Sequence, residues 1–301
     1  MTAGETKRII EVIGVPIDLG QTQRGVDLGP GALRYAGLRR QLRQLGYELI
    51  DRGNLDVPVR DSLPERRQSN DLPAIRDICS AVYASARRTC ELGHRAVFLG
   101  GDHSIAIGTV GGITHTESVG LIYLDAHGDF NTPETSPSGN IHGMPLATLL
   151  GAGHPELVDI GRPGPKLKPE DVVLIGLREL DEGEKQRLKE SGMQIYTMRE
   201  IDERGIHTVT REALQQLGTH KRLHVSLDLD VLDPAEAPGV GSAAPGGLSY
   251  REAQLLCELI ADTGRLSSVD LVEINPILDE HNRTSTLAVA LTASLFGKSI
   301  L

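Results

Sequence analysis

The stretch from Gly120 to Asp129 reads Gly-Leu-Ile-Tyr-Leu-Asp-Ala-His-Gly-Asp. Its first half is apolar without a break, which is typical of a strand buried on both faces of a parallel sheet. Its second half alternates polar and small residues. Since side chains on an extended backbone alternate with a period of two, Asp125, His127 and Asp129 can point the same way where the strand ends. The stretch therefore predicts a buried parallel strand with a polar site at its C-terminal end.

Seven further runs of apolar or β-branched residues indicate strands. They occupy residues 9–15, 48–51, 96–99, 172–176, 194–196, 223–229 and 268–273. Amphipathic stretches that suit helices lie between them, at residues 32–45, 73–92, 182–190, 208–217 and 250–262. This alternation predicts a doubly wound α/β fold with about eight strands. No internal repeat or linker divides the chain, so residues 1–301 are expected to form a single domain.

Three segments are predicted to be irregular. Residues 128–143 and 233–247 are rich in proline, glycine and polar side chains, and each directly follows a predicted strand. Open α/β sheets place their binding crevice at that edge, so these two loops are candidates for a ligand site. Residues 56–70 are charged and are expected to form an exposed excursion.

Composition narrows the class of protein. Acidic residues outnumber basic ones, 41 against 31, which gives a formal net charge of −10. This excess argues against nucleic acid or an anionic membrane surface as a partner and suits a cationic ligand, although many acidic cytoplasmic proteins share it. The three cysteines have no metal-like or paired spacing, and no apolar run suits a membrane span or a secretion signal. A cytoplasmic protein is expected.

Two other predicted strands, like the one at 120–124, are followed by aspartate or histidine residues at their C-terminal ends. The run at 223–229 carries Asp228 and continues to Asp230, and the run at 96–99 continues to His103. One such aspartate could simply cap the next helix. Four aspartates and two histidines that converge from three strand ends are harder to explain in this way, because buried like charges repel unless a cation compensates them. The pattern predicts a metal site.

The donor types narrow the choice of metal. All six side chains offer carboxylate oxygen or imidazole nitrogen, and none offers a thiolate, which favours Mn²⁺, Mg²⁺ or Fe²⁺ over structural zinc. Six donors with aspartates able to bridge suggest two ions about 3.5–4 Å apart, which could share and activate one water molecule.

Three motifs together resemble the metal-binding motifs of the ureohydrolase family. They are Gly-Gly-Asp-His-Ser at 100–104, Asp-Ala-His-Gly-Asp at 125–129 and Ser-Leu-Asp-Leu-Asp at 226–230. The family includes arginases, agmatinases, guanidinobutyrases and formiminoglutamases, and the resemblance extends from residues 13–20 to residues 273–280. It implies a three-layer αβα sandwich around a mostly parallel sheet of about eight strands, in agreement with the strand count above.

The resemblance also implies two manganese ions per subunit. One ion would be held by His103, Asp125, Asp129 and Asp228. The other would be held by Asp125, His127, Asp228 and Asp230, so that Asp125 and Asp228 bridge the two. Family members are commonly trimers or hexamers, so a homotrimer or homohexamer is expected.

Residues 20–30 and 138–145 resemble those of bacterial arginases, which implies an amino-acid substrate. The carboxylate and amino group of that substrate need hydrogen-bonding partners. The side chains that match arginase positions for this role are Asn131, Ser136, Ser138, Asn140, Asp181, Glu184 and Ser242. Two simpler explanations remain, since residues 131–143 could be a polar surface loop and Asp181 could cap the helix that begins at Glu182.

The implied reaction is hydrolysis of L-arginine to L-ornithine and urea by hydroxide formed at two manganese ions. In that resemblance Glu273 holds the guanidinium group, Asp129 relays a proton and His142 acts as a proton shuttle. Agmatinase or another guanidino-compound hydrolase is the alternative. Ser242, Ala243 and Val231 depart from the usual arginase pattern, and residues 233–239 are reminiscent of agmatinases.

Overall fold

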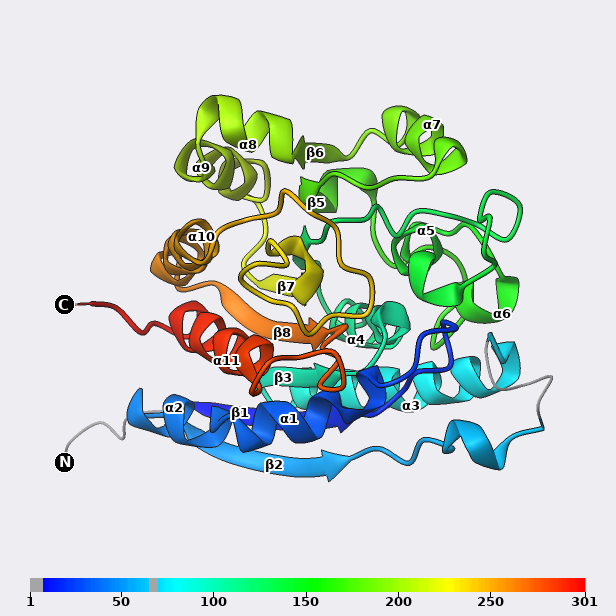
Figure 1. Ribbon diagram of the computed structural model, residues 1–301, viewed down its shortest axis with the longest axis horizontal. Helices are drawn as coiled ribbons and strands as arrows, with labels where there is room; N and C mark the ends of the chain where they lie inside the picture. Colours follow the sequence, from blue (N-terminus) through cyan, green and yellow to red (C-terminus); the bar gives the residue numbers. More distant parts are fainter. Residues whose placement is uncertain (1–7, 65–69, 301) are drawn as a thin grey trace.

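Eight parallel strands form one sheet in the computed structural model, which describes residues 8–64 and 70–300 (Figure 1). Their order across the sheet is β2-β1-β3-β8-β7-β4-β5-β6. The strands are β1 (Ile9–Val15), β2 (Glu48–Asn54), β3 (Arg95–Gly100), β4 (Gly120–Leu124), β5 (Val172–Leu177), β6 (Gln194–Thr197), β7 (Leu223–Asp228) and β8 (Leu266–Val272). All eight predicted strands are confirmed, each within a few residues of its expected bounds.

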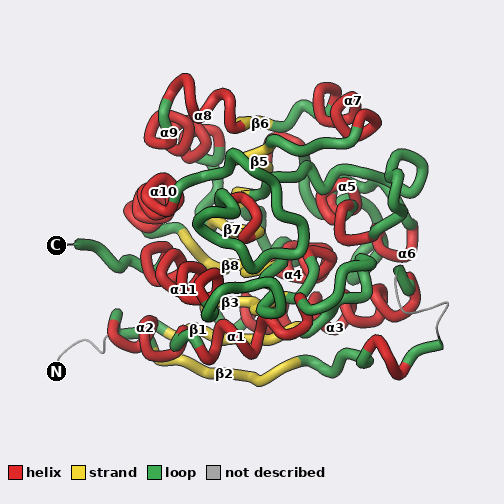
Figure 2. The backbone as a smooth tube through the Cα atoms, in the orientation of Figure 1, coloured by secondary structure: helices red, strands yellow, loops and turns green. Residues whose placement is uncertain are grey.

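Helices cover both faces of the sheet (Figures 1 and 2). One face is covered by α1 (Gly29–Tyr35), α2 (Leu38–Gln44), α8 (Met198–Arg204), α9 (Ile206–Gln216), α10 (Tyr250–Asp262) and α11 (Arg283–Leu295). The other is covered by α3 (Leu72–Glu91), α4 (Ala106–Ile113), α5 (Pro145–Leu149), α6 (Pro155–Val158) and α7 (Glu182–Glu190). This is the expected three-layer αβα sandwich.

The alternation of side chains along β4 shows how the layers are held together. Leu121 and Tyr123 pack into the hydrophobic core under α4 and α5, whereas Ile122 and Leu124 pack into the core on the opposite face. All four side chains are buried. A strand whose two faces both contact helices has to be apolar throughout, which explains the uninterrupted run in the sequence.

The strand order decides where polar side chains can meet. The four strands β3, β8, β7 and β4 are neighbours in the middle of the sheet, and all run in the same direction. Their C-terminal ends therefore open onto one edge. The segments that follow β3, β4 and β7 carry His103, Asp125 and Asp230. Three motifs that are far apart in the sequence are thereby brought to one place.

The helices differ from the prediction in several places, and α5, α6, α8 and α11 have no counterpart among the predicted stretches. The single stretch expected at 32–45 forms two helices, α1 and α2, because Gly37 adopts a left-handed φ of 93° between them. Helix α4 was not predicted, since its residues Ala106–Ile113 are buried on all sides and show no amphipathic pattern. It packs so closely against α3 that a Cβ on Gly108 would lie 2.5 Å from the carbonyl oxygen of Cys79.

The segment 56–70 is only partly the exposed excursion that was expected. Arg60 is buried, its Nε lies 3.0 Å from Oδ2 of Asp18, and it donates to the carbonyl oxygen of Gln21 at 2.8 Å. Residues 65–69 lie outside the described part of the chain, as do residues 1–7 and 301. Among the helices described, none is long and apolar enough to cross a bilayer.

A buried ion-pair network ties β1 to the edge of the sheet. Glu11 on β1 is 2% exposed and accepts hydrogen bonds from Arg52 Nε at 2.8 Å and Arg52 Nη2 at 3.0 Å. His94 Nδ1 lies 2.8 Å from Oε1 of the same carboxylate. The hydrogen bonds from Arg52 outweigh burial and lower the pKa of Glu11 to about 2. The ionised carboxylate therefore stabilises the fold.

Replacing Glu11 with glutamine is expected to lower the free energy of unfolding by about 2–3 kcal/mol near neutral pH. Because the pKa of Glu11 is lower in the folded protein, this contribution is present above its ordinary pKa of 4.5 and fades as the pH falls towards 2. Chemical denaturation of both proteins at neutral and acid pH measures the difference. Glu182→Gln, at a side chain that is 92% exposed, should change stability by less than about 0.5 kcal/mol. An equal effect of the two substitutions would contradict this account.

Candidate metal centre

His103 follows β3 at the start of a short 3₁₀ helix, η4 (His103–Ile105). The preceding Asp102 caps this turn, since its Oδ1 accepts from the N–H of Ser104 at 3.0 Å. Its Oδ2 accepts from the N–H of Gly20 at 2.8 Å, which fixes the turn against the segment after β1. The imidazole of His103 is 1% exposed and points into the edge of the sheet.

The segment after β4 supplies three more donors. Asp125 Oδ1 accepts from the N–H of His127 at 2.7 Å, which turns the chain directly behind the strand. Asp129 has a left-handed φ of 48°, an unusual conformation for a residue with a side chain. The phenolic O–H of Tyr123 donates to Asp129 Oδ2 at 2.7 Å and orients that carboxylate. Strained backbone of this kind is concentrated at functional sites.

The segment after β7 supplies the remaining two, within the 3₁₀ helix η7 (Leu229–Val231) and at its cap. Asp228 Oδ1 accepts from the N–H of Asp230 at 2.8 Å. Asp230 Oδ1 accepts from the N–H of Ala126 at 3.1 Å, which joins this turn to the one after β4. The guanidinium of Arg178 stabilises this turn, because it donates a hydrogen bond to the backbone carbonyl oxygen of Asp230 at 2.6 Å. Two separate motifs are thus fixed to each other.

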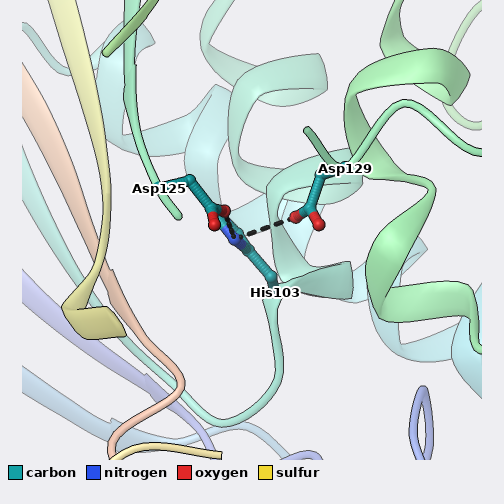
Figure 3. Close-up of side chains that lie close together, drawn as sticks. All are labelled: His103, Asp125 and Asp129. Atoms are coloured by element: carbon teal, nitrogen blue, oxygen red, sulfur yellow. Dashed lines mark ion pairs between the residues drawn. The ribbon is translucent and has the colours of Figure 1, made fainter. Parts of the chain in front are cut away.

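His103 lies at the centre of the first group of side chains. Its Nδ1 is 3.1 Å from Asp125 Oδ2, 3.0 Å from Asp129 Oδ2 and 3.3 Å from Asp228 Oδ2. Figure 3 shows His103, from the segment after β3, and Asp125 and Asp129, from the segment after β4, pointing towards one another. His103, Asp125 and Asp129 can each offer one atom such that all lie within 4.8 Å of one another.

A second group shares Asp125 with the first. His127 Nδ1 lies 3.0 Å from Asp230 Oδ2 and 3.4 Å from Asp125 Oδ1. Asp125, His127 and Asp230 again place one donor atom each within 4.8 Å of one another. Since Asp125 presents one oxygen to each group, it is placed to bridge two cations. The structure therefore brings together all six side chains that the sequence predicted as metal ligands.

The chemistry of the cluster fits divalent cations. His103 Nδ1 and Asp125 Oδ2 are buried and have no hydrogen-bond partner among the described residues. Burial opposes a charge on His103, but the three carboxylates around it raise its pKa well above the usual value. Burial and the charges of Asp230 and Asp125 likewise raise the pKa of Asp228. Crowded buried carboxylates favour bound cations, and the oxygen and imidazole donors present suit Mn²⁺.

Glu273 lies beside the cluster, directly after β8, and its backbone is also left-handed, with a φ of 60°. Its Oε1 accepts from the N–H of His103 at 2.9 Å and lies 2.9 Å from Nδ1 of His142. Its Oε2 accepts from Nε2 of Gln21 at 2.8 Å. These three partners use three of the roughly four accepting positions of a carboxylate, so one further N–H can bind without displacing them. Burial opposes a charge on His142, but Glu273 raises the pKa of His142 to about 9.

One cavity of about 100 Å³ joins Glu273 to the cluster. Ten residues line it: His127, Asp129, Asn131, His142, Gly143, Glu184, Asp228, Asp230, Ser242 and Glu273. The three side chains predicted as catalytic all line it, and so do four of the metal donors, with Asp129 belonging to both sets. Asn131, Glu184 and Ser242 are the predicted substrate contacts that also reach it.

The other predicted substrate contacts lie away from this cavity. Ser138 is exposed and Ser136 and Asn140 are half-buried, and these three side chains bond mainly to neighbouring parts of the chain. Ser136 Oγ accepts from the N–H of Gly139 at 3.0 Å, and Ser138 Oγ accepts from the N–H of Asn140 at 3.2 Å. These bonds shape the loop at 131–143, and none of the three side chains lines the cavity.

Asp181 precedes α7 but does not cap it with its side chain. Its Oδ2 accepts instead from Nδ2 of Asn131 at 2.9 Å. The simple alternative for this residue, a helix cap, is therefore wrong. Glu184 is 3% exposed, and its Oε1 accepts from the N–H of Phe130 at 2.8 Å. Burial raises the pKa of Glu184 to about 7.

The departures from the arginase pattern leave the cluster intact. Val231 is fully buried, and its side chain fills the space over Gly176, where an added Cβ would come within 2.4 Å of Val231 Cγ2. Ser242 keeps a hydroxyl-bearing side chain on the cavity wall, and Ala243 beside it is exposed.

Sequence analysis missed several residues of the site. Gln21 and Tyr123 contact Glu273 and Asp129, and both are buried. Ser226 lies 2.8 Å from Nε2 of His103. The sequence could have indicated Ser226, because it precedes Asp228 by two residues on a buried strand. The two side chains therefore lie on the same face of the sheet.

Comparison with known proteins agrees with this geometry. The model of the arginase family matches residues 8–297. Arginase from Bacillus caldovelox is 50% identical over 296 residues, which are 97% of this chain and 99% of that protein. The crystal structure of the same arginase superposes with a TM-score of 0.93 over 98% of this chain and 100% of that chain. The crystal structure of arginase from Bacillus cereus, 48% identical, gives 0.92 over 98% and 100%.

Proposed function

This chain belongs to the arginase family, and from that premise we propose that it hydrolyses L-arginine to L-ornithine and urea at a centre of two manganese ions. The observation that carries the proposal is that Glu273 and the carboxylate cluster face one cavity. A cationic guanidinium held by Glu273 would lie beside the cluster. The net charge of −10 favours a cationic substrate as well.

The metal donors in this proposal are His103, Asp125, His127, Asp129, Asp228 and Asp230. When bound, two divalent ions supply Lewis-acid activation of water. Asp129 lines the cavity and accepts a hydrogen bond from Tyr123, which supports the role we assign to its carboxylate: it would accept a proton from the attacking water and release it to the leaving nitrogen. Glu273 binds and orients the guanidinium through a charge-assisted hydrogen bond.

The amino-acid end of the substrate would meet Asn131 first. Asn131 is 5% exposed and lines the cavity, and its Oδ1 accepts from Thr135 Oγ1 at 3.0 Å. Its bond to Asp181 places a carboxylate where an α-amino group could bind. We assign Glu184 and Ser242 to the cavity wall on the same side, and Ser136, Ser138 and Asn140 to the rim, where contact through water suits their exposure.

Urea release by the purified, manganese-loaded protein tests this function, with L-arginine and agmatine as parallel substrates. The two differ by the α-carboxylate, so the proposal predicts turnover of arginine and little of agmatine. Preference for agmatine would contradict the role given to the loop at 131–143. Inactivity on both would contradict the reaction itself.

His142→Ala is expected to lower kcat by about a hundredfold while both metal ions stay bound. His142 lines the cavity and contacts Glu273, and among the described residues no hydrogen bond or ion pair joins its side chain to a proposed metal ligand. Its loss would therefore remove a proton carrier and one partner of Glu273, but no metal ligand. Steady-state kinetics combined with metal analysis measures both properties. Loss of manganese in this variant would instead make His142 a ligand.

Asn131→Ala is expected to raise KM for arginine by about tenfold, because the variant loses a buried hydrogen-bonding side chain on the cavity wall. Ser138→Ala, at an exposed side chain on the same loop, serves as the matched control and should raise KM much less. Initial-rate measurements on the two variants give the comparison. An equal or larger effect of Ser138→Ala would contradict the placement of Ser138 at the rim.

The proposal extends to assembly and location. A homotrimer or homohexamer in the cytoplasm is the state that the family resemblance implies. Light scattering coupled to size-exclusion chromatography tests the assembly, and cell fractionation tests the location.

A further inference from the structure

A line of buried polar groups lies behind His103, on the side away from the carboxylate cluster. Nδ1 of the imidazole faces the carboxylates, whereas Nε2 lies 2.8 Å from Oγ of Ser226. Oγ of Ser226 in turn lies 3.4 Å from Oδ2 of Asp270. Ser226 and Asp270 are fully buried. The two ring nitrogens of His103 therefore have different partners.

The pairing of β7 with β8 creates this line. The parallel register sets Ser226 opposite Asp270 and His224 opposite Ser268. Since side chains on a strand alternate with a period of two, His224, Ser226 and Asp228 share one face of β7. One strand thus supplies a carboxylate to the cluster and, two residues earlier, a hydroxyl to the back of His103.

Asp270 is the end of the line, and the polar groups around its carboxylate all approach Oδ2, whereas Oδ1 is buried without a hydrogen-bond partner among the described residues. Thr109 Oγ1 donates to Oδ2 at 2.6 Å, and Nε2 of His224 lies 3.1 Å from the same oxygen. Nδ1 of His224 lies 2.9 Å from Oγ of Ser268. A carboxylate buried this completely is costly and none of the steps proposed above uses it. In the hydrogen bond between the two residues, the O–H of Ser226 donates to Oδ2 of Asp270.

The direction of that hydrogen bond decides which ring nitrogen of His103 carries the proton in the neutral imidazole. A serine hydroxyl has one hydrogen, and once Asp270 accepts it, the oxygen of Ser226 can only accept from His103. Nε2 then keeps its proton when the imidazole is neutral, which leaves the lone pair of Nδ1 free for a metal ion held among the carboxylates. The ring of Tyr123 stacks on the imidazole, with centroids 4.5 Å apart and an interplanar angle of 9°, and holds its plane.

We propose that Ser226 and Asp270 are positioning residues that fix the orientation and tautomer of His103, so that Nδ1 is the nitrogen offered to one of the two metal ions. This inference rests on the proposed binuclear site. The buried carboxylate of Asp270 on β8 would then contribute to the affinity of one of the two metal sites, the one that contains His103. Partners of this kind typically change metal affinity by about 10–100-fold when they are removed.

Titration of metal-stripped protein with Mn²⁺ alone, followed by calorimetry, tests the inference. Ser226→Ala should weaken one of two sites by about 10–100-fold and leave the other, which contains His127, within about twofold. Asp270→Asn tests the link from its far end, because an amide can donate to Ser226 and reverse the hydrogen bond. The same single site should weaken. Ser267→Ala is the matched control, since Ser267 is buried on β8 but donates to the carbonyl oxygen of Leu223 at 2.9 Å.

The outcomes separate this inference from the proposed function. Failure of the unmodified protein to take up two Mn²⁺ would contradict the binuclear site itself. Two sites in the unmodified protein that keep their affinities in both variants would overturn the positioning role. An equal loss at both sites would overturn it too, because Ser226 and Asp270 would then support only the fold. Circular dichroism checks that each variant is folded before its affinities are compared.

Discussion

Replacing Asp125 with alanine is expected to abolish manganese binding and to lower kcat/KM for arginine by more than about a thousandfold. Asp125 is fully buried and presents Oδ2 to His103 and Oδ1 to His127. Asp125 belongs to both groups of donors found among the described residues. Its removal would leave each ion with fewer ligands and would also release the turn that Asp125 Oδ1 forms with the N–H of His127.

Asp228→Ala should behave in the same way, since the family resemblance makes Asp228 the second bridging ligand and its Oδ2 lies 3.3 Å from His103 Nδ1. Metal analysis and steady-state kinetics on the same preparation measure both losses. Asp77→Ala, at a side chain that is 69% exposed on α3, controls for the loss of an aspartate elsewhere. A fully active Asp125→Ala variant that still binds two ions would contradict the bridging assignment.

Glu273→Gln is expected to lower kcat/KM for arginine by roughly a thousandfold without loss of manganese. The substitution keeps the shape of the side chain and removes the charge that would pair with the guanidinium. It also places an amide among the three donors of Gln21, His103 and His142, which a neutral carboxamide satisfies less well than a carboxylate.

Glu280→Gln, at an exposed glutamate on the loop after β8, is the matched control and should leave kcat/KM unchanged within about twofold. Metal content has to be measured alongside, because Glu273 accepts from the backbone of His103 and could influence that ligand. A Glu273→Gln variant with ordinary kinetics would contradict the assignment of the guanidinium to this carboxylate.

The strands and the metal donors could be predicted because both depend on short-range patterns. Strand β4 is apolar throughout because helices pack on both of its faces, and a spacing of two residues places Asp125, His127 and Asp129 on one side of the chain. That four strand ends meet depends on the strand order, which the sequence does not spell out. The family resemblance indicated which strand ends come together.

What could not be predicted depends on contacts between distant segments. Helix α4 looks unlike a surface helix because its glycines permit close packing on α3 and every side is buried. The pairing of Ser226 with Asp270 exists only in the register of β7 against β8. Asp181 has the sequence position of a helix cap, and its carboxylate is directed elsewhere because Asn131 is folded next to it.

The most direct test of the account is a titration of metal-stripped protein with Mn²⁺ while urea release from L-arginine is followed. The account predicts that the rate rises until two ions are bound per chain and then stays constant, since the two groups of donors act through the shared Asp125. Full activity with one ion or none, or two bound ions without urea release, would contradict it.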